Sequence, residues 1–367
     1  MFADAYRGKT VFVTGHTGFK GSWLCLWLER LGARVVGYSL APPTDPSLFE
    51  QAEVASGIEH NIGDVRDAAM LSAALKAAGP DFVFHLAAQP LVIDSYAAPA
   101  ETFATNVTGS INLMEAVRAS GMRGGVVMVT TDKVYLNREW EHAYRENDPL
   151  GGHDPYSASK AAMEIAAASW RSSFFEPGKD AQHGVRIASA RAGNVIGGGD
   201  WSANRLVPDL MRALAGNGQP ALRNAGSLRP WQHVLEPLAG YLWLGAKLAG
   251  PQGERFAQGW NFGPQSADVR SVGDLADAVL AAWGAPGWTD ATEPGALHEA
   301  GLLRLAIDMA VGQLGWRPVW NFAETAARTA GWYKTVTAQP ETARAATLAD
   351  LDAYIAAATA LGLPFAR

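Results

Sequence analysis

A tyrosine and a lysine four residues apart, Tyr156 and Lys160, close the stretch "GGHDPYSASK". Residues at i and i+4 share one face of a helix, and Pro155 suits the first turn of that helix. A lysine ammonium held near a phenol favours the phenolate and lowers its pKa from about 10 toward neutrality. Helices carry such a pair by chance, but together with a second polar motif the pair indicates proton-transfer chemistry.

The stretch "VTTDKVY" upstream supplies a second polar motif, at the end of an apolar run. It places Thr131, Asp132 and Lys133 where a predicted strand ends, so that a hydroxyl, a carboxyl and an amine can meet a substrate. A lysine at its ordinary pKa of about 10.4 is almost fully charged at neutral pH. We expect burial beside Lys160 to lower the pKa of Lys133, because desolvation and a like charge both disfavour the ammonium.

Three glycines, Gly15, Gly18 and Gly21, lie between the first predicted strand and the first predicted helix in "TVFVTGHTGFKGSWL". Glycines at such a turn let backbone N–H groups and a helix N-terminus approach a pyrophosphate. The spacing is G-x-x-G-x-x-G and not the commoner G-x-G-x-x-G, so a purely structural turn stays an alternative. The position at the start of a βαβ array favours a dinucleotide site.

The end of the second predicted strand reads "GYSLAPPTDPS" and lacks the acidic residue that usually binds the adenosine ribose of NAD. From the residues alone, the choice between NAD and NADP stays open, and Lys20 or Arg34 could meet a 2′-phosphate. We expect Ser39 to contact the ribose. Asp64 in "GDVRD" either accepts a hydrogen bond from the adenine amino group or lies in a surface turn.

The first half of the chain alternates short apolar runs with amphipathic stretches, which is the pattern of parallel βαβ units. We expect strands at "TVFVTG", "RVVGYS", "DFVFHLA", "GVVMVTT" and "RIASARAG". Helices are expected in "GSWLCLWLERLG", "AMLSAALKAAG", "AETFATNVTGSINLMEAVRASG" and from Tyr156 to about Phe175. Nearly all-apolar strands are typical of a sheet covered on both faces, so we predict an α/β fold with a Rossmann-type, doubly wound parallel sheet.

A smaller, mixed C-terminal domain is expected after the glycine-rich stretch "GGGDW". Residues 1–197 then form the dinucleotide-binding domain, to which segments near 230–263 return, and residues 198–367 form a substrate-binding domain. "GWNFGP" predicts a short strand, "SVGDLADAVLAAWG" a helix with Asp274 in its first turn, and the alanine-rich C-terminal stretch another helix.

Composition and charge argue against several classes of protein. The chain has 367 residues, 48% of them hydrophobic, and a net charge of −6 without clustered Lys and Arg, which argues against a nucleic-acid partner. No apolar run approaches the roughly 20 residues that span a bilayer, and the first residues lack the apolar core of a signal peptide. The only cysteine, Cys25, lies in an apolar stretch, and no His or Cys cluster has metal-ligand spacing. We expect a cytoplasmic protein without membrane or metal sites.

Five motifs together carry a resemblance to a known family: TGHTGFKG, LAAQ, TTDKVY, YSASK and RAGNVIGGGDW. Over essentially its whole length the chain resembles the extended short-chain dehydrogenases/reductases, and among them the nucleotide-sugar 4,6-dehydratases. "ENDPLGGHDPYSASK", "NRLVPD" and "LRPWQHVLEPL" are most similar to the members that act on CDP-glucose. Relatives that act on dTDP-glucose carry Thr-Asp-Glu where this chain has Thr131, Asp132 and Lys133.

The resemblance implies a reaction at the hexose of a nucleotide sugar, with tightly bound NAD that is recycled. Tyr156, as phenolate beside Lys160, would take the proton of the 4-hydroxyl while hydride leaves C4, and Thr131 would hydrogen-bond the same oxygen. The 4-ketone acidifies the C5 proton, so that Lys133 would act as the C5 base while Asp132 protonates the departing 6-hydroxyl. Return of the hydride to C6 would give a 4-keto-6-deoxy sugar. Two alternatives stay open for Lys133: it could orient a water that acts as the C5 base, or it could be a charged residue that positions the substrate.

The resemblance also implies which residues bind the two ligands. The cofactor set comprises the glycine loop, neighbouring strand ends and the catalytic pair: Gly15, Thr17, Gly18, Phe19, Lys20, Gly21, Ser39, Asp64, Val65, Leu86, Ala87, Ala88, Tyr156 and Lys160. The substrate set is Gln89, Asn194, Arg205, Arg229 and Asn261. Of these, Arg229, Asn194 and Asn261 would hold the substrate pyrophosphate. A surface ion pair is an equally good interpretation of Arg205, and His85 is expected to be a buried, hydrogen-bonded histidine.

Other functions stay open beside this one. A 4,6-dehydratase could act on another nucleotide sugar, and a nucleotide-sugar 4-epimerase would share Tyr156 and Lys160 without needing Asp132 and Lys133. A non-catalytic NAD(P)-binding regulator would keep the fold without turnover. The helical stretches "AETFATNVTGSINLMEAVRA" and "YSASKAAMEIAAASW" could pair with their copies in a four-helix bundle, as in this family's dimers, and either a homodimer or a homotetramer is expected.

Overall fold

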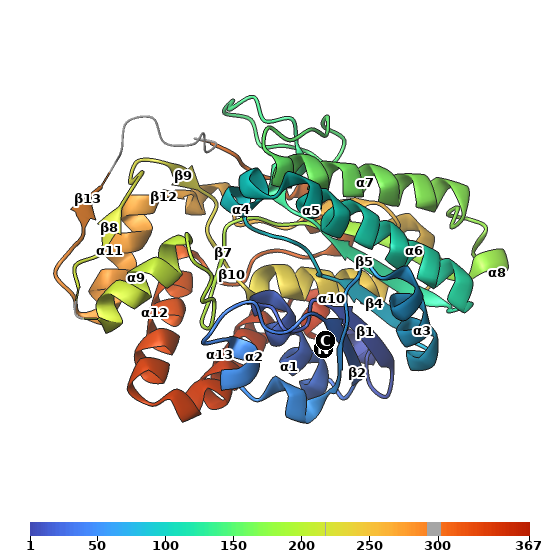
Figure 1. Ribbon diagram of the computed structural model, residues 1–367, viewed down its shortest axis with the longest axis horizontal. Helices are drawn as coiled ribbons and strands as arrows, with labels where there is room; N and C mark the ends of the chain where they lie inside the picture. Colours follow the sequence, from blue (N-terminus) through green and yellow to red (C-terminus); the bar gives the residue numbers. More distant parts are fainter. Residues whose placement is uncertain (217, 292–301) are drawn as a thin grey trace.

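A sheet of seven strands forms the centre of the molecule (Figure 1) in the computed structural model, which describes residues 1–216, 218–291 and 302–367. In sheet order the strands are β11 (Gly259–Asn261), β6 (Val185–Arg191), β5 (Gly124–Val129), β4 (Phe82–His85), β1 (Thr10–Thr14), β2 (Arg34–Ser39) and β3 (Glu59–Ile62). Every neighbouring pair is parallel. The predicted doubly wound parallel sheet is confirmed.

Helices cover both faces of this sheet, as Figure 1 shows. The longer ones are α1 (Phe19–Arg30), α3 (Ala68–Ala78), α6 (Gly109–Ser120), α7 (Pro155–Ser173) and α10 (Leu235–Ala249). The helices α3, α6 and α7 pack on one face, and α1 and α10 pack on the other. The short helices are α2 (Leu48–Gln51), α4 (Val92–Ala97), α5 (Pro99–Phe103) and α8 (Asp180–His183). Within the described ranges, no helix has the length and apolar character needed to cross a membrane.

Burial on both faces explains the apolar strands. Val126 and Met128 of β5 belong to the core under α3, α6 and α7, whereas Val127 and Val129 belong to the core that α1 and α10 cover. Successive strand residues point to opposite faces, so a strand covered on both sides must be apolar throughout. Cys25 of α1 is buried in the second core, as predicted.

The strand order reverses between β1 and β4. In open α/β sheets, ligands bind in the crevice outside the carboxyl ends of the strands at such a switch point. The loops that follow β1, β4 and β5 carry the glycine motif, the LAAQ motif and the Thr131–Lys133 motif. The topology therefore brings together residues that are far apart in the sequence.

A smaller group of helices and short strands lies to the left of the sheet in Figure 1. Its helices are α9 (Leu206–Ala215), α11 (Val272–Trp283) and α12 (Phe322–Ala338). Three strand pairs accompany them: β7 (Val195–Ile196) with β10 (Gln232–His233), β9 (Leu228–Arg229) with β12 (Arg270–Ser271), and β8 (Ala221–Leu222) with β13 (Thr289–Asp290). Ser271 and Asp274 form a capping box that begins α11 where the sequence predicts it.

The C-terminal helix α13 (Ala343–Ala360) packs against the dinucleotide-binding half of the chain. Tyr354 meets Trp27 of α1 edge-on with ring centroids 5.7 Å apart. Arg344 donates to both carboxylate oxygens of Glu29 at 2.8 Å. The assignment of all of residues 198–367 to the smaller domain therefore needs correction, because the apolar face of α13 completes the burial of Trp27.

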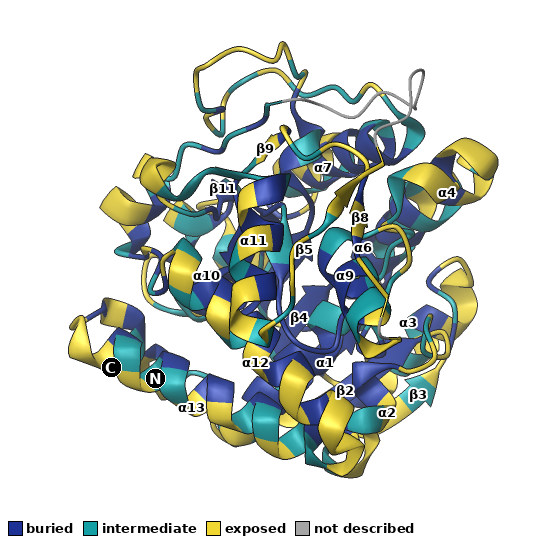
Figure 2. Ribbon diagram, turned by 90° about the vertical axis from the view of Figure 1, so that its left-hand side faces the viewer, coloured by how far each residue is buried: buried dark blue, intermediate teal, exposed yellow. Residues whose placement is uncertain are grey.

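The two ends of the chain meet beside α13. The rings of Phe2 and Phe365 stack with centroids 6.0 Å apart, and the Ala3 N–H donates to the Arg367 carbonyl at 2.9 Å. Figure 2 shows both ends side by side next to α13, whose outer surface is exposed. The first and last residues thus close the same layer of the core.

Candidate active site

The motifs identified in the sequence meet at the carboxyl edge of the sheet. Thr131 follows β5, and the next residues form the 3-10 helix η4 (Asp132–Val134), on which α7 packs. Asp154 caps α7 by accepting a hydrogen bond from the Ser157 N–H at 2.9 Å, and Pro155 takes the first helical position. These local rules fix where α7 begins, so that Tyr156 lies in its first turn beside the end of β5.

Two glycines of the loop after β1 are required by the fold itself. Gly15 has a left-handed φ of 74°, and a Cβ there would lie 2.6 Å from the backbone nitrogen of Ala87. A Cβ on Gly21 would lie 2.1 Å from the carbonyl oxygen of Gly15. A Cβ on Gly18 would meet only that same carbonyl, at 3.4 Å. Gly18 is therefore the position that is open to a ligand.

Helix α1 begins at this loop without a side chain to satisfy its first N–H groups. Its N-cap is Gly18, which makes no side-chain cap hydrogen bond. The first N–H groups of a helix have no intrahelical partner, so those of Phe19 and Lys20 are free to bind an anion. The loop therefore fits the pyrophosphate of a dinucleotide.

The expected adenosine contacts lie beside the glycine loop. Ser39 ends β2, and its Oγ lies 3.0 Å from Thr17 Oγ1. Asp64 forms an ion pair of 2.6 Å with Arg66, and the hydrogen bonds from Arg66 hold the pKa of Asp64 below its ordinary value. Val65 is buried against Gly109. A ribose contact through Ser39 and an adenine contact through Asp64 stay predictions.

Tyr156 is buried next to Thr131. Burial raises the pKa of its phenol to about 12, against the opposing effects of a hydrogen bond with Thr131 and of the charge of Arg205. The expectation that Lys160 brings this pKa toward neutrality is wrong for the protein by itself. The Lys160 ammonium donates instead to the Val129 carbonyl at 3.2 Å, so nothing outweighs desolvation of the phenol.

Lys160 is a buried amine whose charge is marginal. Burial lowers its pKa from 10.5 to about 7; the charge of Lys20 lowers it further and that of Glu164 opposes the change. The like charge that acts on Lys160 comes from Lys20, and the proximity of Lys133 and Lys160 stays a prediction. Asp132 and Val134 take the buried side of η4, so Lys133 between them is partly exposed.

Asp132 is held by two neighbours at the centre of the site. It is 2% exposed, and its two oxygens accept hydrogen bonds from Thr131 Oγ1 at 2.9 Å and from Asn194 Nδ2 at 3.2 Å. Gly193 makes room for it, because a Cβ there would lie 2.0 Å from the carboxylate carbon. The hydroxyl, the carboxyl and the amide therefore form one connected group, as the sequence motifs indicate.

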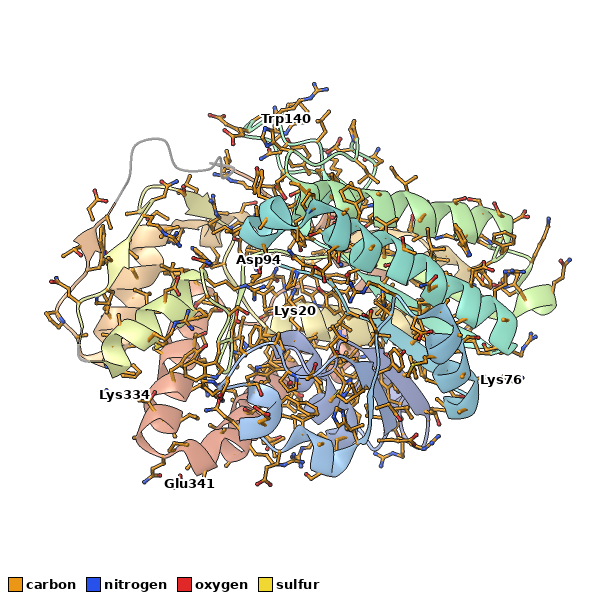
Figure 3. The ribbon with its side chains drawn as sticks, viewed as in Figure 1. Lys20, Lys76, Asp94, Trp140, Lys334 and Glu341 are labelled. Carbon is orange, nitrogen blue, oxygen red and sulfur yellow. The ribbon has the colours of Figure 1, made fainter. Side chains whose placement is uncertain are left out.

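Lys20 lies in the catalytic cluster and not near a 2′-phosphate position. Burial lowers its pKa to about 8, and the charges that act on it are those of Arg205, Asp132 and Asp200. Figure 3 places Lys20 near the middle of the molecule, whereas the other labelled lysines lie at its periphery. The 2′-phosphate interpretation of Lys20 is corrected, because the charged groups that act on its ammonium belong to the catalytic cluster.

Arg205 forms an ion pair with an acid that the sequence reasoning missed. Its Nη1 lies 2.8 Å from Asp200 Oδ2, and Asp200 is 4% exposed. The alternative of a surface ion pair for Arg205 is corrected, because its acid is buried in the site and the charge of Arg205 also acts on Tyr156. Asp200 directly follows a run of glycines, and nothing in that sequence context indicates that it lies in the site.

Asn261 does not face a ligand. It is fully buried, its Oδ1 accepts from the Tyr135 hydroxyl at 2.7 Å, and its Nδ2 donates to the carbonyls of Tyr144 at 2.9 Å and Ala306 at 3.1 Å. Every polar atom of the side chain is thus used within the fold. The expected pyrophosphate contact is corrected, because β11 places Asn261 under the loop that precedes α7.

The sequence also singles out Gln89, Arg229 and His85, and each has a different environment. Gln89 uses its side-chain amide within its own turn, where it bonds the backbone of Leu91 at 2.6 and 3.0 Å. Arg229 lies in β9, in the smaller domain, and donates to the Leu228 carbonyl. His85 is confirmed as a buried histidine, since its ring nitrogens lie 2.7 Å from Thr14 Oγ1 and 2.9 Å from Ser110 Oγ.

Comparisons with known proteins agree with this geometry. The model of the NAD dependent epimerase/dehydratase family matches residues 11–259. The chain is 49% identical over 329 residues to the CDP-glucose 4,6-dehydratase of Salmonella typhimurium, which covers 90% of this chain and 91% of that protein. It is 31% identical over 274 residues to the dTDP-glucose 4,6-dehydratase of Streptomyces antibioticus, covering 74% and 75%.

Solved structures show the same fold. The dTDP-glucose 4,6-dehydratase DesIV of Streptomyces venezuelae, solved with NAD and TYD bound, superimposes with a TM-score of 0.73 at 25% identity and covers 90% of this chain and 99% of that one. A UDP-glucose 4-epimerase of Stenotrophomonas maltophila with bound NAD gives a TM-score of 0.76 at 22% identity, covering 90% and 99%. At that identity the epimerase shows the fold alone.

Proposed function

The chain belongs to the NAD-dependent epimerase/dehydratase family, and we propose from this premise that it is a CDP-glucose 4,6-dehydratase. It removes water across C5 and C6 of the glucose and yields CDP-4-keto-6-deoxyglucose. The observation that carries this proposal is the similarity to the Salmonella enzyme over almost the whole chain. The group formed by Thr131, Asp132 and Asn194 beside Tyr156 supplies the polar atoms that the reaction needs.

The cofactor is NAD, held by the loop of Gly15, Gly18 and Gly21 and by the N-terminus of α1. When bound, NAD accepts the hydride from C4 and returns it to C6, so the reaction has no net redox change. Ser39 and Asp64 would contact the adenosine, and Leu86, Ala87 and Ala88 lie where β4 ends beside the same loop.

Tyr156 and Thr131 act at the 4-hydroxyl. The buried phenol receives the proton of that hydroxyl once it is ionised, and Thr131 hydrogen-bonds the same oxygen. The pKa of about 12 in the protein by itself means that ligand binding must lower it. A positive charge that approaches the phenol favours the phenolate. Arg205, whose charge already acts on Tyr156, and Lys160 on the same helix are the side chains that would supply it.

Asp132 and Lys133 act at C6 and C5. Asp132 would protonate the departing 6-hydroxyl, for which Thr131 and Asn194 hold its carboxyl in place. Lys133 would remove and return the C5 proton, and its partly exposed position gives it access to solvent protons. A 4-epimerase would need neither group, so these two residues favour the dehydratase over the epimerase.

The substrate diphosphate would be held by arginine. Arg229 of β9 and Arg205, which directly precedes α9, come from the smaller domain, which faces the carboxyl edge of the sheet. Arginine makes bidentate, charge-assisted hydrogen bonds to phosphate oxygens. Asn194, with its left-handed φ of 51°, is bonded to Asp132 and would also hold the substrate pyrophosphate.

The test is to incubate the purified protein separately with CDP-glucose, dTDP-glucose and GDP-mannose, with and without added NAD. We expect loss of one water from CDP-glucose, detected by mass and by the alkaline absorbance of the 4-keto product. Turnover without added NAD would support a cofactor that stays bound. Water loss from another substrate only would overturn the assignment to CDP-glucose, and no water loss at all would favour an epimerase or a non-catalytic protein.

We also propose that the protein works in the cytoplasm as a homodimer or homotetramer. Large apolar side chains lie exposed on α5 and α7, with Phe103 39% and Ile165 60% exposed. A patch of this kind suits burial against a second copy. Light scattering after gel filtration should give twice or four times the chain mass of 38.9 kDa, and Ile165→Lys should reduce it. A wild-type protein with the mass of one chain would contradict the proposal.

A further inference from the structure

We propose, on the basis of the dehydratase function above, that the buried ion pair between Glu164 and Arg191 is a clamp that positions the catalytic segment Thr131–Lys133 from both ends. Arg191 begins the motif RAGNVIGGGDW, but neither residue is among the site residues expected from the sequence. Glu164 lies on α7 one turn beyond Lys160, and Arg191 ends β6. Their side chains are 3% and 5% exposed.

Four hydrogen bonds hold the Glu164 carboxylate in place. Arg191 donates to both oxygens of Glu164, from Nε at 2.9 Å and from Nη2 at 3.0 Å. The hydroxyls of Thr130 and Ser189 donate to the same carboxylate at 2.6 and 2.5 Å. A buried carboxylate with four donors stays ionised: burial alone would raise the pKa of Glu164, but Arg191 and the two hydroxyls hold it below its ordinary value.

Each half of the ion pair holds one end of the catalytic segment. Glu164 accepts from Thr130, which directly precedes Thr131. Arg191 donates from Nη1 to the hydroxyl of Tyr135, which directly follows η4, at 2.7 Å. The residues between Thr130 and Tyr135 therefore span two anchors that are joined to each other by a bidentate ion pair.

The same carboxylate faces the catalytic lysine. Tyr156, Lys160 and Glu164 follow one another at i, i+4 and i+8 on one face of α7, and the charge of Glu164 opposes the loss of the Lys160 proton. The charged and titratable groups around the two residues are Lys20 from α1, His85 from β4, Arg191 from β6, Tyr135 after η4, Glu146 from the following loop and Arg171 from α7. The acid whose charge raises the pKa of Lys160 is Glu164.

Glu164 and Arg191 also line a cavity. Its volume is about 420 Å³, and Arg171 and Glu146 are among the other residues that line it. A fully hydrogen-bonded pair in such a wall gives it a fixed shape.

Two conservative variants test the clamp from its two ends. Thr130→Val and Tyr135→Phe each remove one hydroxyl and keep the shape of the side chain. Misplacement of catalytic groups by a fraction of an ångström to 1 Å lowers turnover by up to about 100-fold, so we expect kcat to fall about 10- to 100-fold with KM for CDP-glucose unchanged. We expect Thr130→Ser, which keeps a hydroxyl, to retain the wild-type kcat.

Tyr144→Phe is the matched control. Tyr144 stacks on Tyr135 with ring centroids 5.1 Å apart, but its hydroxyl bonds Asn137 and the Arg138 N–H instead of Arg191. We expect this variant to keep the wild-type kcat. Equal losses in Tyr144→Phe and Tyr135→Phe would show general disturbance of the aromatic layer and would overturn the clamp.

Hydrogen–deuterium exchange without ligands gives a second readout that does not depend on activity. Peptides covering residues 130–135 should exchange faster in Thr130→Val, Tyr135→Phe and Glu164→Gln than in the wild type or in Tyr144→Phe. If these variants keep both the exchange rates and the kcat of the wild type, the proposal is wrong. If the wild type is inactive on every sugar nucleotide yet these variants exchange faster, the dehydratase function fails and the clamp stands as a structural element.

Discussion

Burial decides the protonation of the catalytic tyrosine and lysine. Burial raises the pKa of Tyr156 to about 12 and lowers that of Lys160 to about 7, so both groups favour their neutral forms. Placing a charged amine next to another amine, Lys20, adds to this effect. Binding of a ligand that brings an opposite charge or a hydrogen bond to these groups would favour their charged forms.

Removing the phenol of Tyr156 should stop the reaction at its first proton transfer. We expect Tyr156→Phe to lower kcat for CDP-glucose by about 100- to 10,000-fold, the usual contribution of a positioned base. The variant should bind CDP-glucose as the wild type does, because the ring remains. Calorimetric binding together with product mass measures both effects, and a kcat within tenfold of the wild type would refute the assigned role.

Removing the buried amine of Lys160 should stabilise the fold at low pH. Below about pH 7 the amine is charged in both folded and unfolded chains, so the full cost of burying the charge is present; between about 7 and 10.5 only the unfolded chain binds the proton, and stability recovers as pH rises. We therefore expect Lys160→Met to raise the free energy of unfolding by a few kcal/mol near pH 6, and the gain to vanish above about pH 10.5.

Chemical denaturation across this pH range measures that difference. Lys76→Met serves as the control, because Lys76 lies at the surface in Figure 3. A gain in Lys160→Met that does not change with pH would mean that folding does not lower the pKa of the Lys160 amine.

At the scale of elements, the turn between β1 and α1 combines a structural requirement with an open binding position. Gly15 and Gly21 are enclosed by backbone atoms, whereas Gly18 has free space around it. The N-terminus of α1 supplies unpaired N–H groups at the same place. The three glycines of one motif thus have different roles, which two substitutions can separate.

Gly21→Ala and Gly18→Ala should affect different properties. A Cβ at Gly21 meets a backbone carbonyl at 2.1 Å, so we expect Gly21→Ala to lower the free energy of unfolding by about 1–3 kcal/mol. Gly18→Ala meets the same carbonyl only at 3.4 Å, so it should keep stability while weakening NAD binding. Denaturation curves and fluorescence titration with NAD test the pair, and equal stability of the two variants would contradict this division.

At the scale of the whole molecule, the last helix and the chain ends complete the dinucleotide-binding half. Tyr354 packs on Trp27, and its hydroxyl donates to the buried Glu236 of α10 at 2.8 Å. Phe365 stacks on Phe2. The layer that covers α1 and α10 therefore comes from residues at opposite ends of the sequence, so the large domain cannot be complete before the whole chain is present.

Phe365→Ala should destabilise the fold although it lies two residues from the end of the chain. Phe365 is fully buried, and loss of a buried phenylalanine costs about 3–5 kcal/mol. Leu361→Ala is the control, because Leu361 is 46% exposed and surface substitutions change stability by about 0.5 kcal/mol at most. Thermal and urea unfolding compare the two, and equal stability would show that the C-terminal residues are not part of the core.

Local patterns by themselves determined the sheet, the helices and the catalytic motifs of this protein. Alternating apolar runs and amphipathic stretches, the glycine turn, and the i and i+4 spacing of Tyr156 and Lys160 each depend on residues close in the sequence. The i+8 position of Glu164 was visible in the same way, but its partner Arg191 lies on another strand.

Only the tertiary structure decided which polar groups meet and which are buried. It directed Lys20 toward Asp132 and Asp200, used Asn261 entirely within the fold, and placed α13 on α1. Each of these contacts joins residues far apart in the chain, and burial raises or lowers pKa values by removing water from groups whose neighbours the sequence does not name. Long-range packing therefore determined the charges of the site, while short-range spacing determined its chemistry.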